Sequence, residues 1–373
     1  MTREIIFGGI LRVCKILCKF ARYFIVMRRL ISIIIFSVVW LSVFSQNGGE
    51  KTYKFLNIPT SARITAQGGF NVSHIDGDLS YVNANPAMLT ADMNNQFVLS
   101  YTNYVSDINL GYAIYARNFE KAGIFSAGIQ YLNYGRFYNT NELGEVLGKF
   151  NAADYAINIS YAYPLKKFNF GGTLKTIVSD YWEATSFGMA VDLGATYKDT
   201  ASLFSAGLVF KNLGFQIKKY TKGVRENLPI DMQLGITKKF KHAPFSLSLT
   251  AIDLFNWSLR YESTLRNNYT NNEEVKENFL NKLGHAGDEF MRHIVLSADI
   301  NIKNVFYISL GFNYRRRSEL ALTNKGKIVG FSAGCGVCLK KFSLEYSYSS
   351  YHLAGSVNYV SLKINLDNII RKN

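Results

Sequence analysis

The chain has 373 residues and a formal net charge of +15, with 48% hydrophobic but only 18% charged residues. Soluble proteins usually carry roughly 25% charged residues, so this balance, together with 27 Phe and 24 Tyr, favours a protein with a large apolar surface. There are only five prolines and no evident linker. One large domain is therefore predicted rather than several small ones.

The first 45 residues have the pattern of a leader. A basic pair follows Met27, an apolar run comes next, and the small residue Ser45 precedes Gln46, as in a secretory signal peptide. The apolar run is interrupted by serines and is shorter than the roughly 20 residues of a membrane-spanning helix, so a membrane anchor is the weaker alternative. A signal peptide is predicted over 27–45, and 1–26 is attributed to a start codon placed too far upstream.

Much of the basic charge belongs to this leader. The first 45 residues hold seven of the 42 Lys and Arg and one of the 27 Asp and Glu, so the remaining chain carries a formal charge of +9. Lysines scattered among aromatic segments suit anionic lipid headgroups, but they do not resemble a nucleic-acid groove. Nucleic acid is therefore not an expected partner.

Two cysteines, Cys335 and Cys338, remain after the leader, in "GFSAGCGVCLKK". A C-x-x-C pair raises the possibility of a metal or redox site. The surrounding residues read as a strand, however, in which residues three apart point to opposite faces. The two thiols are therefore interpreted as small strand residues.

From Gln96 onward, segments of about ten residues alternate between apolar and polar side chains. In "KFSLEYSYSSY", Phe342 and Leu344 fall on one face, and Ser343 and Glu345 fall on the other. The fourteen predicted strands begin near Gln96, Ser106, Gly123, Asp154, Phe168, Ala184, Leu203, Asp231, Phe245, Met291, Val305, Lys327, Phe342 and Ser356. Their length and even number are typical of an antiparallel transmembrane β-barrel.

The connections support a barrel over a soluble sandwich, because tight turns alternate with longer segments. The longer segments are expected at 136–151, 218–229, 260–290 and 316–324. Starting from a periplasmic N-terminus, this parity places both termini in the periplasm and all the long loops outside the cell. Trp182 and Trp257 then fall at the outer water interface, where an aromatic girdle belongs. The expected arrangement is a plug-like segment over 46–95 and an outer-membrane barrel over 96–373.

No pattern for catalysis or cofactor binding emerges. His293, Ser297 and Asp299 share a strand face, but four residues along a strand span about 13 Å, too far for a catalytic triad. The Asp76-Gly77-Asp78 sequence lacks the further ligands of a calcium loop. The chain is therefore expected to be non-enzymatic, without metal or cofactor.

The densest basic cluster is formed by Arg315, Arg316 and Arg317, which are predicted at the outer rim of the eleventh strand. Guanidinium groups suit bidentate phosphate recognition, so lipopolysaccharide headgroups or an anionic partner are candidate ligands. A solvated rim without a ligand is the alternative.

"SARITAQGG", an acidic spacer and "NANPAML" together resemble the N-terminal region of the FadL/OMPP1-like outer-membrane proteins. Five stretches, two of which overlap those just quoted, resemble the PorQ-like proteins of the type IX secretion system of Bacteroidota: "FLNIPTSARITAQGG", "NPAMLT", "LTAIDLFNWSL", "GFNYRRRSEL" and "YHLAGSVNYVSL". This resemblance extends from Tyr53 to Leu366. The C-terminus "NLDNIIRKN" departs from the terminal aromatic residue found in many such barrels.

The resemblance implies a fourteen-stranded barrel with an N-terminal segment in or beneath it, and no catalytic residues. It implies a role in the attachment complex, where a PorZ-like surface protein, PorU and PorV would be partners and cargo would be joined to lipopolysaccharide. The loop at 260–290 is expected to hold the surface partner. The alternative is a FadL-like transporter of hydrophobic small molecules, against which polar inner faces such as Ser343–Ser349 argue mildly.

Overall fold

The computed structural model describes residues 51–120, 122–221, 223–224, 226–259, 279–303, 305–320, 328–352 and 355–370. The predicted leader lies outside these residues. Among the described residues, no helix is long and apolar enough to cross a membrane.

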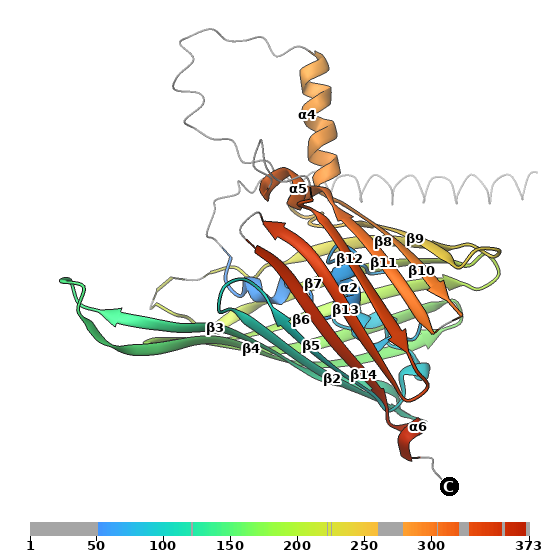
Figure 1. Ribbon diagram of the computed structural model, residues 1–373, viewed down its shortest axis with the longest axis horizontal. Coiled ribbons are helices and arrows are strands. Elements are labelled where there is room, and N and C mark those ends of the chain that lie inside the picture. Colours follow the sequence, from blue (N-terminus) through green and yellow to red (C-terminus); the bar gives the residue numbers. More distant parts are fainter. Residues whose placement is uncertain are drawn as a thin grey trace, which may run out of the picture. The chain divides into compact units, whose positions relative to one another are not determined.

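Fourteen antiparallel strands close into one barrel, as predicted (Figure 1). They are β1 (Gln96–Asn103), β2 (Asn109–Phe119), β3 (Gly123–Thr140), β4 (Val146–Leu165), β5 (Phe168–Tyr181), β6 (Ala184–Asp199), β7 (Phe204–Lys218), β8 (Asp231–Lys239), β9 (Phe245–Ala251), β10 (Ile294–Ile302), β11 (Phe306–Asn313), β12 (Phe331–Cys338), β13 (Phe342–His352) and β14 (Gly355–Asn365). Each strand pairs with its neighbours in sequence, and β14 pairs with β1 to complete the ring. Closure removes the free sheet edges from the ring in which the fourteen strands pair.

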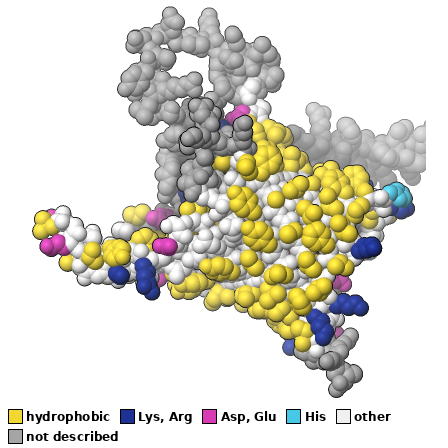
Figure 2. Space-filling model, viewed as in Figure 1, with side chains coloured by type: hydrophobic (Ala, Val, Ile, Leu, Met, Phe, Trp, Pro, Cys, Tyr) yellow, Lys and Arg dark blue, Asp and Glu magenta, His cyan; other side chains and the backbone are white. Residues whose placement is uncertain are grey.

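The alternation predicted for β13 is confirmed. Leu344 and Tyr346 are exposed on the outer wall, whereas Ser343 and Glu345 are buried inside. Apolar side chains cover much of the outer wall in Figure 2, and Lys and Arg side chains lie at its margins. Because lipid requires an apolar outer surface and a closed hydrogen-bond ladder, the barrel has the construction of a membrane-spanning protein.

The two ends of the barrel differ in their connections. Strands β2, β4, β6, β8, β10 and β12 lead into the next strand through turns of only a few residues, and this end is called the short-turn end. The connections after β7, β9 and β11 are longer, and they lie at the opposite, long-loop end. The predicted sorting of loops by length is therefore confirmed for the connections after the seventh, ninth and eleventh strands. Trp182, between β5 and β6, and Trp257, after β9, both belong to the long-loop end.

Residues 51–95, the plug segment, lie inside the barrel and contain only short helical turns (Figure 1). These are η1 (Lys54–Asn57), α2 (Ala62–Ala66), η2 (Leu79–Tyr81), η3 (Pro86–Met88) and η4 (Ala91–Met93). Polar side chains start three of these turns: Ser61 accepts a hydrogen bond from the amide of Ile64, Asp78 from that of Ser80, and Asn85 from that of Ala87. Irregular backbone is tolerated at this depth because protein surrounds it.

Glycines of the wall allow the plug backbone to approach closely. A Cβ at Gly311 of β11 would collide with the backbone of Gln67 and Gly68, and one at Gly207 of β7 would collide with Val72. A Cβ at Gly171 of β5 would likewise collide with the backbone of Pro86. The plug therefore touches the wall on several sides of the lumen, and small residues there are a condition of its packing.

The predicted loop at 136–151 is wrong, because strand structure continues through most of it. The strand β4 begins at Val146 rather than near Asp154, and β3 extends to Thr140. Their hairpin projects past the neighbouring strands in Figure 1. A bulge between Asn133 and Arg136, with Gly135 at a φ of +87°, precedes this extension. The bulge interrupts the sequence alternation, although pairing resumes after it.

Two of the other predicted loops contain helices in their described parts. The helix α4 (Phe279–Arg292) occupies the end of 260–290, whose residues 260–278 lie outside the described part. The helix α5 (Tyr314–Leu320) follows β11 directly, and a short α6 (Asp367–Ile370) follows β14. Both α4 and α5 belong to the long-loop end.

The first and last described residues lie at opposite ends of the barrel, and the periplasmic position of both chain termini stays a prediction. Lys51 pairs with Asn227 in the long connection between β7 and β8, at the long-loop end. Asp367 accepts hydrogen bonds from Asn94 and Asn95, next to the start of β1 at the short-turn end. The plug segment therefore runs the length of the lumen before β1 begins.

Candidate functional site

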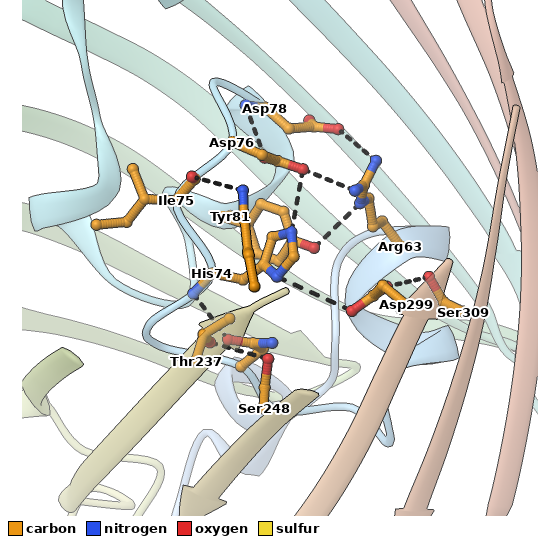
Figure 3. A network of polar contacts seen from close by, with 12 residues as sticks. Arg63, His74, Ile75, Asp76, Asp78, Tyr81, Thr237, Ser248, Asp299 and Ser309 are labelled. Carbon is orange, nitrogen blue, oxygen red and sulfur yellow. Dashed lines mark hydrogen bonds and ion pairs between the residues drawn. The ribbon is translucent and has the colours of Figure 1, made fainter. Parts of the chain in front are cut away.

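A buried ionic network joins the plug segment to the wall, and Arg63 of α2 is its centre (Figure 3). Nη2 of Arg63 lies 2.6 Å from Oδ2 of Asp76, and Nε donates to the Tyr81 hydroxyl at 3.1 Å. The guanidinium also lies 4.0 Å from the centroid of the Tyr307 ring on β11. A buried charge requires such partners, because an unpaired guanidinium in the lumen would lose its hydration without compensation.

Asp78 connects the same network to the last strand of the barrel. Its Oδ2 lies 2.9 Å from Nζ of Lys363 on β14 and 3.9 Å from Nη1 of Arg63. Burial by itself would raise the pKa of the Asp78 carboxyl, but Lys363 and Arg63 hold it below its usual value despite the nearby Asp76 carboxylate. The aspartate is therefore an anion that links α2, the following loop and β14.

A third link runs through Asp299 of β10. Both carboxylate oxygens accept from Nε2 of Gln67, at 2.9 and 2.7 Å, and the Ser309 hydroxyl of β11 also donates to it. The His74 ring stacks on Tyr81, and its Nε2 lies 3.3 Å from Oδ2 of Asp76. The other ring nitrogen of His74 is 3.9 Å from Asp299. An imidazole thus lies between a carboxylate of the plug and a carboxylate of the wall.

A separate polar cluster holds the start of the plug segment. Lys175 of β5 and Asp192 of β6 form a buried ion pair at 2.6 Å, and Nζ of Lys175 also donates to Asn212 of β7 at 2.9 Å. Asn212 in turn donates to the side-chain oxygen of Asn57 at 3.0 Å. Wall charges therefore fix the plug near the long-loop end as well as at its middle.

These contacts bind the plug to the wall, and they do not assemble the polar strand residues considered for catalysis. His293, Ser297 and Asp299 do not form a triad: the His293 ring nitrogens face the carbonyl oxygens of Ile252 and Trp257, at 2.7 and 3.2 Å. Within the described ranges, no group of three His, Cys, Asp or Glu side chains could hold a metal ion. The network pairs buried charges of the plug segment with each other and with charged groups of the wall.

The two cysteines are free thiols, in agreement with their interpretation as strand residues. Cys335 is exposed on the outer wall, and Cys338 follows at the end of β12 on the alternate side of the strand. The C-x-x-C spacing therefore does not bring two sulfurs to one site.

The extension of the β3–β4 hairpin over 136–151, called the arm, forms a second candidate site at the long-loop end. The strand β2 pairs with β3 only as far as Asn133, and β5 pairs with β4 only from Ala152 onward. Beyond these points the two arm strands pair only with each other. Both outer edges of the arm therefore present backbone donors and acceptors that have no strand partner.

Apolar side chains are unusually exposed on the arm. Leu143 at its tip is 85% exposed and Leu147 is 66% exposed, and Tyr138 and Val146 are also exposed. Nearer the barrel, Phe150 stacks on Phe137 at 5.3 Å and meets Trp182 edge-on at 4.8 Å, measured between ring centroids. An ordered base carrying an apolar tip is typical of a surface for protein recognition.

The arginine cluster is placed on α5 rather than on a strand. Arg315 forms ion pairs with Asp253 and with Glu319, the latter at 2.9 Å. Arg316 points toward the barrel, where its guanidinium lies 4.0 Å from the Tyr351 ring centroid and donates to the Tyr351 hydroxyl at 2.9 Å. Arg317 lies on the same helix. Arg315 and Arg316 thus have different partners, and headgroup or partner binding by the three arginines stays a prediction.

Sequence reasoning missed the roles of Arg63, His74 and Lys363. A signal was present for one of them, because Lys363 falls on the polar, inward face of its predicted strand. For Arg63 and His74 no periodic pattern exists, since the plug segment has neither a helical nor a strand repeat.

No family model matches the sequence, and no curated protein matches it. The chain is similar in structure to several solved proteins, of which three follow. The CymD monoaromatic hydrocarbon channel has a TM-score of 0.48 and 12% identity, over 83% of this chain and 98% of that one. The deltaS2 mutant of the TodX monoaromatic hydrocarbon channel has a TM-score of 0.47 and 13% identity, over 83% and 99%. A FadL homologue from Pseudomonas aeruginosa has a TM-score of 0.43 and 10% identity, over 82% and 98%.

Proposed function

We propose that this protein is a non-catalytic, plugged barrel of the outer membrane that anchors a surface protein through its long-loop end. The arm is the observation that carries this proposal. It holds Leu143, Val146 and Leu147 in an exposed position beyond the paired wall. Exposed apolar side chains and two free strand edges are costly unless a partner covers them.

The lumen supports an anchoring role rather than an open pore. The plug segment is tied to β14 through Asp78, to β10 through Gln67 and to β7 through Asn57. Displacing it would separate the buried carboxylate of Asp78 from Lys363 of the wall, at a cost of several kcal/mol for the broken ion pair, and would also break the bonds from Gln67 to Asp299. A wall-bound plug makes the barrel a rigid membrane support.

The more specific proposal is membership of the type IX attachment complex, which rests on the resemblance described for the sequence. A PorZ-like surface protein is then the partner expected at the long-loop end, with PorU and PorV in the same assembly. Lipopolysaccharide would surround the barrel, and Arg315–Arg317 would be candidates for contact with its anionic groups.

Copurification from native outer membranes tests this proposal. Phe137 and Phe150 are direct cross-strand partners, so replacing residues 138–149 with Asn-Gly keeps the hairpin closed by a two-residue turn. We expect the tagged wild type to recover a surface protein and the shortened variant to lose it. Ala243→Asp, in an exposed short turn at the opposite end, is the matched control and should retain the partner.

The proposal fails if the shortened variant is folded, as judged by its heat-dependent mobility on gels, and still recovers the same partner. Transport of an alkane or aromatic hydrocarbon into liposomes by the purified wild type, above the rate in protein-free liposomes, would instead favour the transporter alternative.

A further inference from the structure

A hollow of about 720 Å³ lies on the membrane-facing side of the wall, across β7–β13. It is separate from the lumen, because Leu247, Leu296 and Leu310, which line it, are exposed on the outer wall. Ligand sites in proteins commonly enclose about 300–1,000 Å³ and have mainly apolar linings. The hollow therefore has the size and lining of a site for an apolar ligand.

The register of the strands explains the shape of the hollow. One row of outward residues crosses the strands as successive direct partners: Lys238, Leu247, Ala298, Leu310, Ala333 and Tyr348. The parallel row on the long-loop side consists of Ile236, Leu249, Leu296, Phe312 and Phe331, and the row on the short-turn side consists of Phe245, Ile300, Ile308, Cys335 and Tyr346. Ala298 and Ala333 are small residues between larger ones, so they form the floor of a trough.

The trough begins at the membrane boundary and rises into the apolar band. Lys238 is the residue before the end of β8, at the short-turn end, whereas Tyr348 lies in the middle part of β13. A lysine on the lipid face is tolerated at such a boundary because its ammonium group reaches the headgroup region. Nζ of Lys238 is exposed and bonds to the carbonyl oxygen of Ser202, with no carboxylate of the described residues in ion-pair distance.

We propose that this trough binds one acyl chain of a phospholipid from the leaflet at the short-turn end, with Lys238 holding its phosphate. The apolar lining and the small floor residues suit a flexible hydrocarbon chain, and the membrane around the barrel supplies it. The exposed Lys238, which lines the trough toward the short-turn end, gives the lipid its orientation. This site is independent of the arm and of the proposed anchoring role.

Native mass spectrometry of the full chain in a mild detergent tests the proposal, with palmitoyl-oleoyl phosphatidylglycerol added to delipidated protein. We expect a first molecule of this lipid to bind more tightly than any further molecule. The Ala298→Phe/Ala333→Phe variant fills the trough and should lose this binding. Ala127→Phe places the same side chain at an exposed outward position of β3 and should retain it.

Lys238→Gln should weaken the binding about fivefold, since one basic residue near a membrane surface contributes about that much to the attraction of an anionic lipid. Unchanged affinity in either the filled variant or Lys238→Gln overturns the proposal, as does equal binding of a lipid that lacks a phosphate. If the doubly substituted protein does not fold, Ala333→Leu replaces it, with the same expected direction of change.

Discussion

The plug segment and the arm differ in their regularity and in their burial. The plug has almost no regular structure, yet most of its residues are buried because the wall provides their partners. The arm is a regular two-stranded ladder, yet its outer edges and its tip side chains are exposed. Regular secondary structure is therefore a poor guide to stability in this molecule, whereas enclosure by the barrel is a good one.

The largest loss of stability is expected from Arg63→Ala in the plug segment. It leaves Asp76 and Asp78 in the lumen with less compensating charge, so the free energy of unfolding should fall by about 3–5 kcal/mol. Urea unfolding in detergent micelles measures the change. Arg292→Ala, in the more exposed Asp288–Arg292 pair of α4, should cost only about 0.5 kcal/mol.

Adding Asp76→Asn to Arg63→Ala should recover part of the lost stability, because it removes one of the uncompensated charges. If Arg63→Ala and Arg292→Ala have equal effects, the lumen network is not what fixes the plug.

A smaller loss is expected from Gly311→Ala. The added Cβ would collide with the backbone of Gln67 and Gly68, and overpacking of this kind costs about 1–3 kcal/mol. Gly111→Ala is the matched control, because a Cβ at Gly111 of β2 has no neighbour within 4 Å. Protease digestion of the plug segment in the folded barrel is the second measurement. The close packing described for the plug is contradicted if both alanine variants are equally resistant and equally stable.

The smallest effect on barrel stability is expected from Phe150→Ala in the arm. The substitution removes the ring that lies between Phe137 and Trp182, but these contacts are outside the closed wall. We expect the free energy of unfolding to change by less than about 0.5 kcal/mol. Trp182 emission, recorded in a Trp257→Phe background, should shift to longer wavelength as the indole becomes more exposed to water. A loss of stability comparable to that of Gly311→Ala would show that the arm is part of the cooperative barrel.

Much of the barrel could be predicted because a strand in lipid has a strict two-residue period. The faces of β13 follow from Leu344 and Glu345 and their neighbours, and most strand starts fall within a few residues of their predicted positions. For the plug segment, the sequence predicted a position in or beneath the barrel but did not decide between the two.

The arm and the ionic network could not be predicted, for two physical reasons. The arm depends on cross-strand pairs such as Phe137 with Phe150, which are separated by a bulge and a turn and leave no period in either strand alone. The pairing of Arg63 with Asp76, and of Asp78 with Lys363, depends on how the chain folds within the lumen. Neither spacing nor composition determines that path.

The course of the plug segment from Lys51 at one end of the barrel to Gln96 at the other has a consequence for assembly. Gln96 begins β1, which pairs with β14. The ring is therefore closed by pairing between the first and the last strand in the sequence. Lys363, on that last strand, pairs with Asp78 of the segment already inside. Because Lys363 reaches Asp78 only when β14 is in place, closure of the ring and the final anchoring of the plug segment depend on the same strand.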